Sequence, residues 1–110
     1  MIEMTFRLSG NGDTVSTLEK EQLEEMVQDI QGVPKKFKFT GWMNVEIGNT
    51  YSLYVKHMGD RINEEGMMNL TKAVWEIVSN HVTVKDVAIS TLIVLEFEDL
   101  FKPRDMSRVG

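Results

Sequence analysis

An α+β fold with two layers is the class that this sequence predicts, on three observations. Four segments alternate between apolar and polar residues, as strands with one buried face do. Two further segments repeat their apolar residues at the spacing of an amphipathic helix. The segments follow one another in the order β-α-β-β-α-β, which predicts a four-stranded, mainly antiparallel sheet with two helices on one face.

The first strand is predicted over residues 2–9, and the glycine-rich sequence GNGDT follows it as a turn. A helix then begins at Ser16, which stands three residues before Glu19 in the spacing of a capping box. Gly32 and Pro34 are expected to end this helix. Its apolar residues recur at helical spacing and are Val15, Leu18, Leu23, Met26, Val27 and Ile30.

The central hairpin is predicted over residues 35–56, with alternation along both of its strands. A two-residue turn would set apolar residues opposite polar ones, because a slip by one residue turns every side chain to the other face. We therefore expect a three-residue loop over residues 48–50, or a bulge nearby. The resulting register places Trp42 opposite Lys56, on the polar face of the hairpin.

The second helix is predicted to start after Asn63, a residue type preferred at N-caps. Glu64 and Glu65 then fall in the first turn, where the helix dipole favours negative charge. A single last strand is predicted over residues 85–99, and it is the most apolar of the four. The inner stripe of the second helix is Met67, Leu70, Val74, Ile77 and Val78, with Trp75 to one side.

These elements match the ferredoxin-like βαββαβ plan, a two-layer sandwich whose usual strand order is 4-1-3-2. The plan puts the most apolar strand on an edge of the sheet. We therefore expect a different order or a covered edge, and a second copy of the chain is one such cover. We expect a single domain over residues 1–101 and a basic, flexible tail over residues 102–110.

The composition is that of a small acidic globular protein, with 42% hydrophobic residues and a formal net charge of −5. The absence of cysteine excludes disulfides, thiolate metal sites and a cysteine nucleophile, and it fits a reducing compartment. No membrane-spanning run or signal peptide is recognisable, so we expect a cytoplasmic protein. The charges are segregated, since residues 11–34 carry one lysine against six acids and residues 35–59 carry four lysines against one glutamate.

The candidate site is the sheet face that the two helices would leave uncovered, and three interpretations of it stay open. In the first interpretation, the face has no function beyond contact with solvent, and Lys56 lies over Trp42 in a cation–π contact. Alternatively it binds a protein or a second copy of the chain, for which tryptophan and tyrosine are preferred anchors. The third interpretation is single-stranded nucleic acid, with bases stacked on Trp42 and phosphates met by Lys36, Lys38 and Arg7. The candidate residues are Trp42, Tyr54, Lys56, Leu92, Val94 and Lys38.

Motifs for other functions fail on their residues. The predicted third strand, TYSLYVKH, lacks the glycine and the aromatic spacing of an RNA-recognition motif. The turn GNGDT departs from G-x-G-x-x-G at Val15, and Asp13 would repel a phosphate. In HMGDRINEE, the adjacent Glu64 and Glu65 cannot share one helix face, so they do not converge as metal ligands must.

Enzyme chemistry finds little support in the sequence. The chain has two histidines and no G-x-S-x-G elbow from which to build an activated nucleophile. A small enzyme without a recognisable motif is the second alternative, after a single-stranded nucleic-acid-binding protein. The sequence therefore predicts a non-enzymatic protein–protein interaction module, acting as a regulator, an inhibitor or an assembly component, with no cofactor and no metal.

Overall fold

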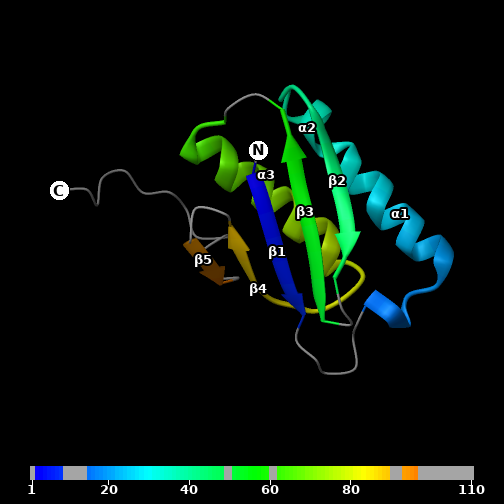
Figure 1. The fold of residues 1–110 in the computed structure, drawn as a ribbon. Helices are drawn as coiled ribbons and strands as arrows, with labels where there is room; N and C mark the ends of the chain where they lie inside the picture. Colours follow the sequence, from blue (N-terminus) through cyan, green and yellow to red (C-terminus); the bar gives the residue numbers. More distant parts are fainter. Residues whose placement is uncertain (1, 9–14, 49–50, 60–61, 90–92, 97–110) are drawn as a thin grey trace.

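The computed structural model describes residues 2–8, 15–48, 51–59, 62–89 and 93–96 of the chain. Within these residues, five strands form one antiparallel sheet, and the three α-helices lie on one of its faces (Figure 1). The elements in chain order are β1 (Ile2–Leu8), a 3₁₀ turn (Val15–Thr17), α1 (Lys20–Gln31), α2 (Val33–Lys36), β2 (Trp42–Ile47), β3 (Ser52–Met58), α3 (Glu64–Ser79), β4 (Val84–Ile89) and β5 (Ile93–Glu96).

The order of the strands across the sheet is β2-β3-β1-β4-β5. Without β5, and counted from β4 toward β2, the strands follow the order 4-1-3-2. The predicted α+β class and the open antiparallel sheet with its two long helices, α1 and α3, are confirmed, and the arrangement is compatible with a ferredoxin-like plan. The described part of the chain departs from that plan in a fifth strand, in the short helix α2 and in the 3₁₀ turn before α1.

The prediction of a single last strand over residues 85–99 is wrong. This stretch supplies two strands, β4 and β5, which pair antiparallel with Val87 opposite Leu95, while residues 90–92 lie outside the described residues. A run of fifteen residues is longer than the roughly 3–10 residues of most strands. Folding it back places β5 along the outer edge of β4, so the cover that β4 needs comes from the chain itself.

The first long helix begins later than predicted. Val15–Thr17 form the 3₁₀ turn, and α1 starts at Lys20 with Glu19 as its N-cap. The capping box therefore joins Glu19 to Gln22, whose Oε1 accepts from the Glu19 amide at 3.1 Å, and the predicted box at Ser16 is wrong.

The predicted long strand before the hairpin turn is also shorter than expected. Gly32 ends α1 in a right-handed helical conformation, and Pro34 lies in the first turn of α2, where its missing N–H is tolerated. Positive φ angles follow at Lys38 (60°) and Gly41 (94°), which an extended strand cannot accommodate. The strand β2 therefore begins only at Trp42.

The register of the β2–β3 hairpin differs from the prediction by two residues. The amide of Gly48 donates to the carbonyl oxygen of Ser52 at 3.1 Å, which centres the turn one residue later than expected. Trp42 therefore lies opposite Met58, and the predicted pairing of Trp42 with Lys56 is wrong. A shift by two residues leaves every side chain on its predicted face, because the side-chain period of a strand is two.

The hydrophobic core lies between the sheet and the helices. Phe6 of β1 and Trp75 of α3 are fully buried and meet edge to face, with ring centroids 6.3 Å apart. The predicted N-cap of α3 is confirmed, since Asn63 Oδ1 accepts from the Gly66 amide at 2.7 Å. Trp75 belongs to the buried stripe rather than to one side of it. The buried residues of α3 are Gly66, Met67, Leu70, Thr71, Val74, Trp75 and Val78.

Candidate interaction surface

The face of the sheet opposite the helices is turned toward the viewer in Figure 1. Along β1, β2 and β3, residues of this face alternate with residues of the core side, so their side chains point away from the helices. Trp42 and Asn44 come from β2, Tyr54 and Lys56 from β3, and Thr5 from β1. We call this side of the sheet the open face.

Trp42 is the most exposed large hydrophobic residue of the described chain, with 63% of its surface accessible to solvent. The alternation of β2 accounts for its position, because its neighbour Met43 is buried against the helices. The predicted placement of the indole in solvent is therefore confirmed.

The backbone that carries Trp42 is closely held. The carbonyl oxygen of Thr40 accepts a hydrogen bond from Nε2 of the buried His57 at 2.9 Å. A Cβ atom added at Gly41 would lie 2.0 Å from the carbonyl oxygen of Met58, so this backbone approaches β3 more closely than any other residue would permit. Trp42 thus extends from a fixed strand end.

The remaining candidate residues fall into two groups. Tyr54 and Lys56 lie half-buried on β3, on the same face as Trp42. The Tyr54 ring covers Gly48, since a Cβ at Gly48 would lie 2.2 Å from Tyr54 Cε2.

Lys38, Leu92 and Val94 are not placed beside Trp42 by the described coordinates. Lys38 lies between α2 and β2 and not on a strand, so its predicted position in the alternating row is wrong. Leu92 lies outside the described residues, and for Val94 the structure gives a backbone position in β5, opposite Ala88.

A bidentate ion pair joins β1 and β4 on the open face. Arg7 Nε and Nη2 donate to the two carboxylate oxygens of Asp86, which stands directly opposite on β4. The hydrogen bonds to Asp86 and its negative charge raise the pKa of Arg7 above its usual value. The guanidinium of Arg7 is therefore held in an ion pair within the sheet.

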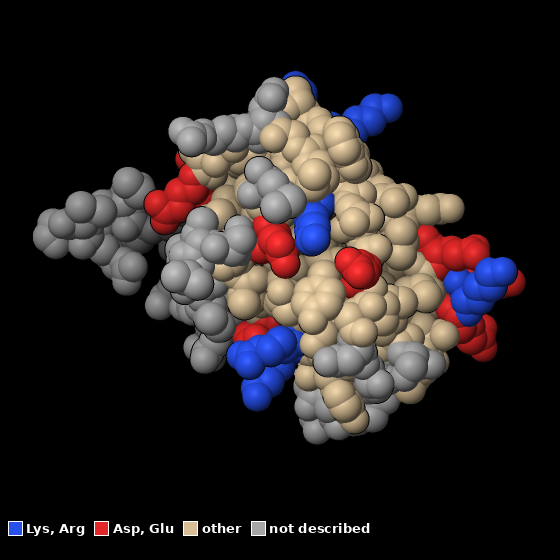
Figure 2. Space-filling model, in the orientation of Figure 1, with Lys and Arg blue, Asp and Glu red and all other residues tan. Residues whose placement is uncertain are grey.

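The other charges of the open face are mixed in sign. Lys56 stands opposite Glu3 on one side and Asn44 on the other, and Glu46 stands opposite Tyr54. Figure 2 shows blue and red groups interspersed in a largely uncharged surface on this side. The open face, as far as the structure describes it, has no concentrated patch of one sign.

Two exposed hydrophobic residues lie on β2, at the margin of the sheet. The large hydrophobic residues exposed in the described chain are Trp42 (63%) and Ile47 (46%) on β2, Tyr51 (47%) just before β3, and Phe37 (38%), which follows α2 and lines the groove between the helices. Alternation assigns Phe37, Ile47 and Tyr51 to the core face and gives no sign of their exposure. The margin is visible only from the strand order, which makes β2 an edge of the sheet.

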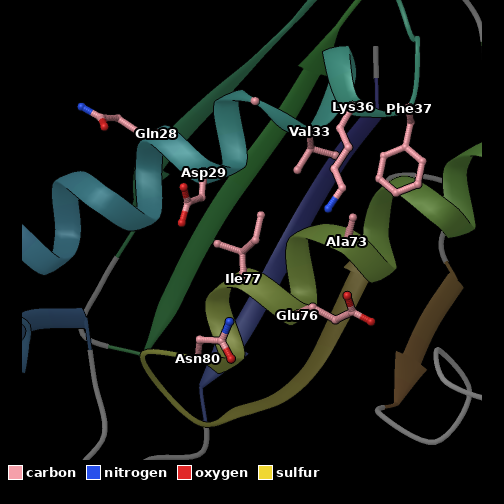
Figure 3. Close-up of a pocket in the computed structure, with 10 residues that line it drawn as sticks. Gln28, Asp29, Val33, Lys36, Phe37, Ala73, Glu76, Ile77 and Asn80 are labelled. Atoms are coloured by element: carbon pink, nitrogen blue, oxygen red, sulfur yellow. The ribbon is translucent and has the colours of Figure 1, made fainter.

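A groove of about 490 Å³ lies on the other side of the molecule, between α3 and the α1–α2 segment (Figure 3). The side chain of Lys36 reaches into it, and Asp29 and Glu76 contribute carboxylates from its two walls (Figure 3). No hydroxyl nucleophile with a histidine base can be assembled from its lining. The lining residues are Gln28, Asp29, Gly32, Val33, Lys36, Phe37, Ala73, Glu76, Ile77 and Asn80.

Neither histidine belongs to a recognisable reactive site. His57 holds the loop before Trp42 through its hydrogen bond to Thr40, and its ring meets Phe39 edge to face with the ring centroids 6.5 Å apart. His81 lies half-buried just beyond α3. Among the described residues, no three histidine, aspartate or glutamate side chains gather as metal ligands would.

The described helices include none with the length and apolarity needed to cross a bilayer. The chain matches no protein-family model, no curated protein and no solved structure.

Proposed function

We propose that this chain is a non-enzymatic protein–protein interaction module, which binds a protein partner through the open face with Trp42 as the anchor. In this role it acts as a regulator, an inhibitor or an assembly component. A chain without cysteine suits the reducing cytoplasm, where we place it. We interpret its architecture as a ferredoxin-like sandwich extended by a fifth strand.

The exposure of Trp42 is the observation that carries the proposal. Tryptophan is among the residues most enriched at interaction hot spots, since it buries a large area on binding. The hydrogen bond between His57 and Thr40 and the close approach at Gly41 hold the strand end that carries the indole. A partner would therefore lose little free energy in ordering the backbone on this side.

The surroundings of Trp42 suit a protein partner. Tyr54 and Lys56 lie on the adjacent strand, and Asn44 and Glu46 alternate with core residues along β2. An aromatic centre with a rim of polar groups of both signs is the composition that protein interfaces favour.

Single-stranded nucleic acid is less well supported, because the basic residues that it requires are not free on this face. Lys36 belongs to α2, Lys38 precedes β2, and Arg7 is paired with Asp86. Lys56 remains, and it stands opposite Glu3. Phosphate binding needs several cations, and the open face does not gather them.

Affinity capture from cells of the native host tests the proposal. The immobilised wild-type chain should retain a protein partner, and Trp42→Ala should lose it, because the anchor is removed while the fold is kept. Phe37→Ala is the matched control, since it truncates another exposed aromatic residue that lies before β2. The retained partner should survive an increase in salt that would release a phosphate-bound ligand.

Fluorescence quenching gives an independent measurement. The chain has two tryptophans, Trp42 in solvent and Trp75 in the core, so iodide should quench Trp42 selectively. The difference between wild type and Trp42→Phe isolates this signal, and the purified partner should protect it. A partner that Trp42→Ala still binds with unchanged affinity would refute the open face as the binding surface.

A further inference from the structure

We infer that two copies of this chain join edge to edge, with β2 of one copy antiparallel to β2 of the other and the two sheets continuous. The inference goes beyond the proposed function, because it concerns the backbone of one sheet edge and a second copy of the chain. The observations that carry it are an edge strand without lysine, proline or a bulge, outward hydrogen-bonding groups and a register in which β2 complements itself.

The strand β2 has few of the residues that keep sheet edges single, since its one charged residue is Glu46. Natural edges are commonly protected by lysine, proline or a bulge. The three lysines at residues 35, 36 and 38 precede β2, which begins only at Trp42. The six residues of β2 contain no lysine and no proline, and their pairing with β3 runs without a register shift.

The hairpin fixes which backbone groups point outward. The amide of Gly48 donates to Ser52 directly opposite, so these two residues form a hydrogen-bonded pair of the ladder. Such pairs alternate along an antiparallel strand, so every second residue back from Gly48 also bonds to β3. The N–H and C=O groups of Met43, Val45 and Ile47 therefore face away from β3, along the outer margin.

A second β2 satisfies these groups when Val45 stands opposite Val45 of the other copy. Met43 then lies opposite Ile47 of the second copy, so all the outward groups meet partners. This register keeps core-side residues opposite core-side residues, as a continuous sheet requires. It also sets Asn44 opposite Glu46 of the second copy and brings no like charges directly together.

The same register covers the apolar residues of the margin. Ile47, which is 46% exposed, meets Met43 of the second copy on the helix side. On the open face, Trp42 lies opposite Gly48 of the second copy, beside the Tyr54 ring that covers that glycine. In this register the indole would lie next to that aromatic ring.

Light scattering on a dilution series of the purified chain tests the inference. The wild type should have the mass of two chains, and Val45→Pro should have the mass of one. Proline removes the outward N–H of Val45 and leaves the bonds from β2 to β3 intact, which is why edge strands tolerate it. Val45→Ala keeps the N–H and should remain dimeric.

Cross-linking tests the register even if Val45→Pro fails to fold. The native chain has no cysteine, so Val45→Cys introduces the only thiol. Directly opposite residues of a hydrogen-bonded pair have Cα atoms about 5.5 Å apart, within the range of a disulfide. Mild oxidation should therefore link two copies of Val45→Cys, and it should not link the control Lys85→Cys on β4.

Three results would overturn the inference: a wild type that stays monomeric at every concentration, a dimer that Val45→Pro leaves intact, or a Val45→Cys dimer that oxidation cannot link. These results are separate from the fate of the proposed function. A monomeric Val45→Pro chain that still captures its partner upholds both, whereas a linked Val45→Cys dimer without any partner upholds this inference alone.

Discussion

Gly41 is the residue on which the position of Trp42 depends. Its φ of +94° lies where residues with a side chain are strained, and its Cα approaches β3 so closely that a Cβ would meet the Met58 carbonyl oxygen at 2.0 Å. The opposing Gly59 is also confined, because its own Cβ would lie 2.6 Å from the Thr40 carbonyl oxygen. The two glycines let the loop and the strand end pass backbone to backbone.

Gly41→Ala should therefore destabilise the fold. Backbone strain alone costs of order 1–3 kcal/mol, and the contact with Met58 adds to it. We expect a lower midpoint of urea unfolding, measured by circular dichroism, and easier exchange of the β2 amide protons.

Gly32→Ala is the matched control for this prediction. Gly32 has a φ of −81°, and a Cβ there would have no neighbour closer than 3.6 Å. Alanine at such a position is neutral or stabilises by about 0.4–1 kcal/mol, because it restricts the unfolded chain. Equal losses in the two variants would show that Gly41 has no special conformation.

Among the elements, α3 is the one whose signals are local, and its predicted N-cap and acidic first turn are confirmed. Its N-cap, its acidic first turn and its apolar stripe are all written within a single stretch of sequence. Asn63→Ala should lower the free energy of unfolding by about 1 kcal/mol, because the Gly66 amide loses its acceptor.

Asn63→Asp separates the cap from other effects of the substitution. Aspartate keeps an oxygen acceptor and adds a negative charge at the helix N-terminus, so it should retain the wild-type stability. Thermal unfolding measured by circular dichroism compares the three proteins. An Asn63→Asp variant as unstable as Asn63→Ala would contradict the capping role.

The elements that the sequence did not predict correctly depend on contacts between distant segments. Alternation continues from Phe37 through Ile47, but only the second half forms β2, because α2 carries the chain through Pro34 and Lys38 adopts a positive φ. Alternation also continues through residues 85–99, and nothing in it marks where the chain turns back into β5. The two-residue period of a strand determines which side chains share a face. The ends of a strand and its neighbours in the sheet depend instead on pairing with distant segments.

The same distinction explains what was predictable of the candidate surface. Trp42 on the open face follows from the parity of β2, which the two-residue change of register preserves. The prediction puts Lys38 on that face only because it extends the strand too far. The pairing of Arg7 with Asp86 requires knowledge that β1 adjoins β4. The alternation of side chains along β2 therefore predicts the face on which the indole lies but not the residues beside it.

At the scale of the whole molecule, the sheet and the helices are held together through a single core. Phe6 lies on β1, the central strand, and its ring meets Trp75 of α3 at an interplanar angle of 70°. Both side chains are fully buried, so this contact joins the two layers near the middle of the fold. Disturbing it should weaken the entire domain, since each layer buries its apolar face only against the other.

Phe6→Ala should lower the free energy of unfolding by about 3–5 kcal/mol, from the lost apolar contacts and the cavity left beneath Trp75. That is a large part of the roughly 5–15 kcal/mol that stabilises a domain. Trp42→Ala removes a larger ring from solvent and should change stability by no more than about 0.5 kcal/mol. Urea unfolding followed by far-ultraviolet circular dichroism measures both variants in their monomeric Val45→Pro background, which excludes any contribution from self-association. Comparable losses from Phe6→Ala and Trp42→Ala would contradict the division of the molecule into one buried and one open sheet face, because the indole would then have to be part of the core.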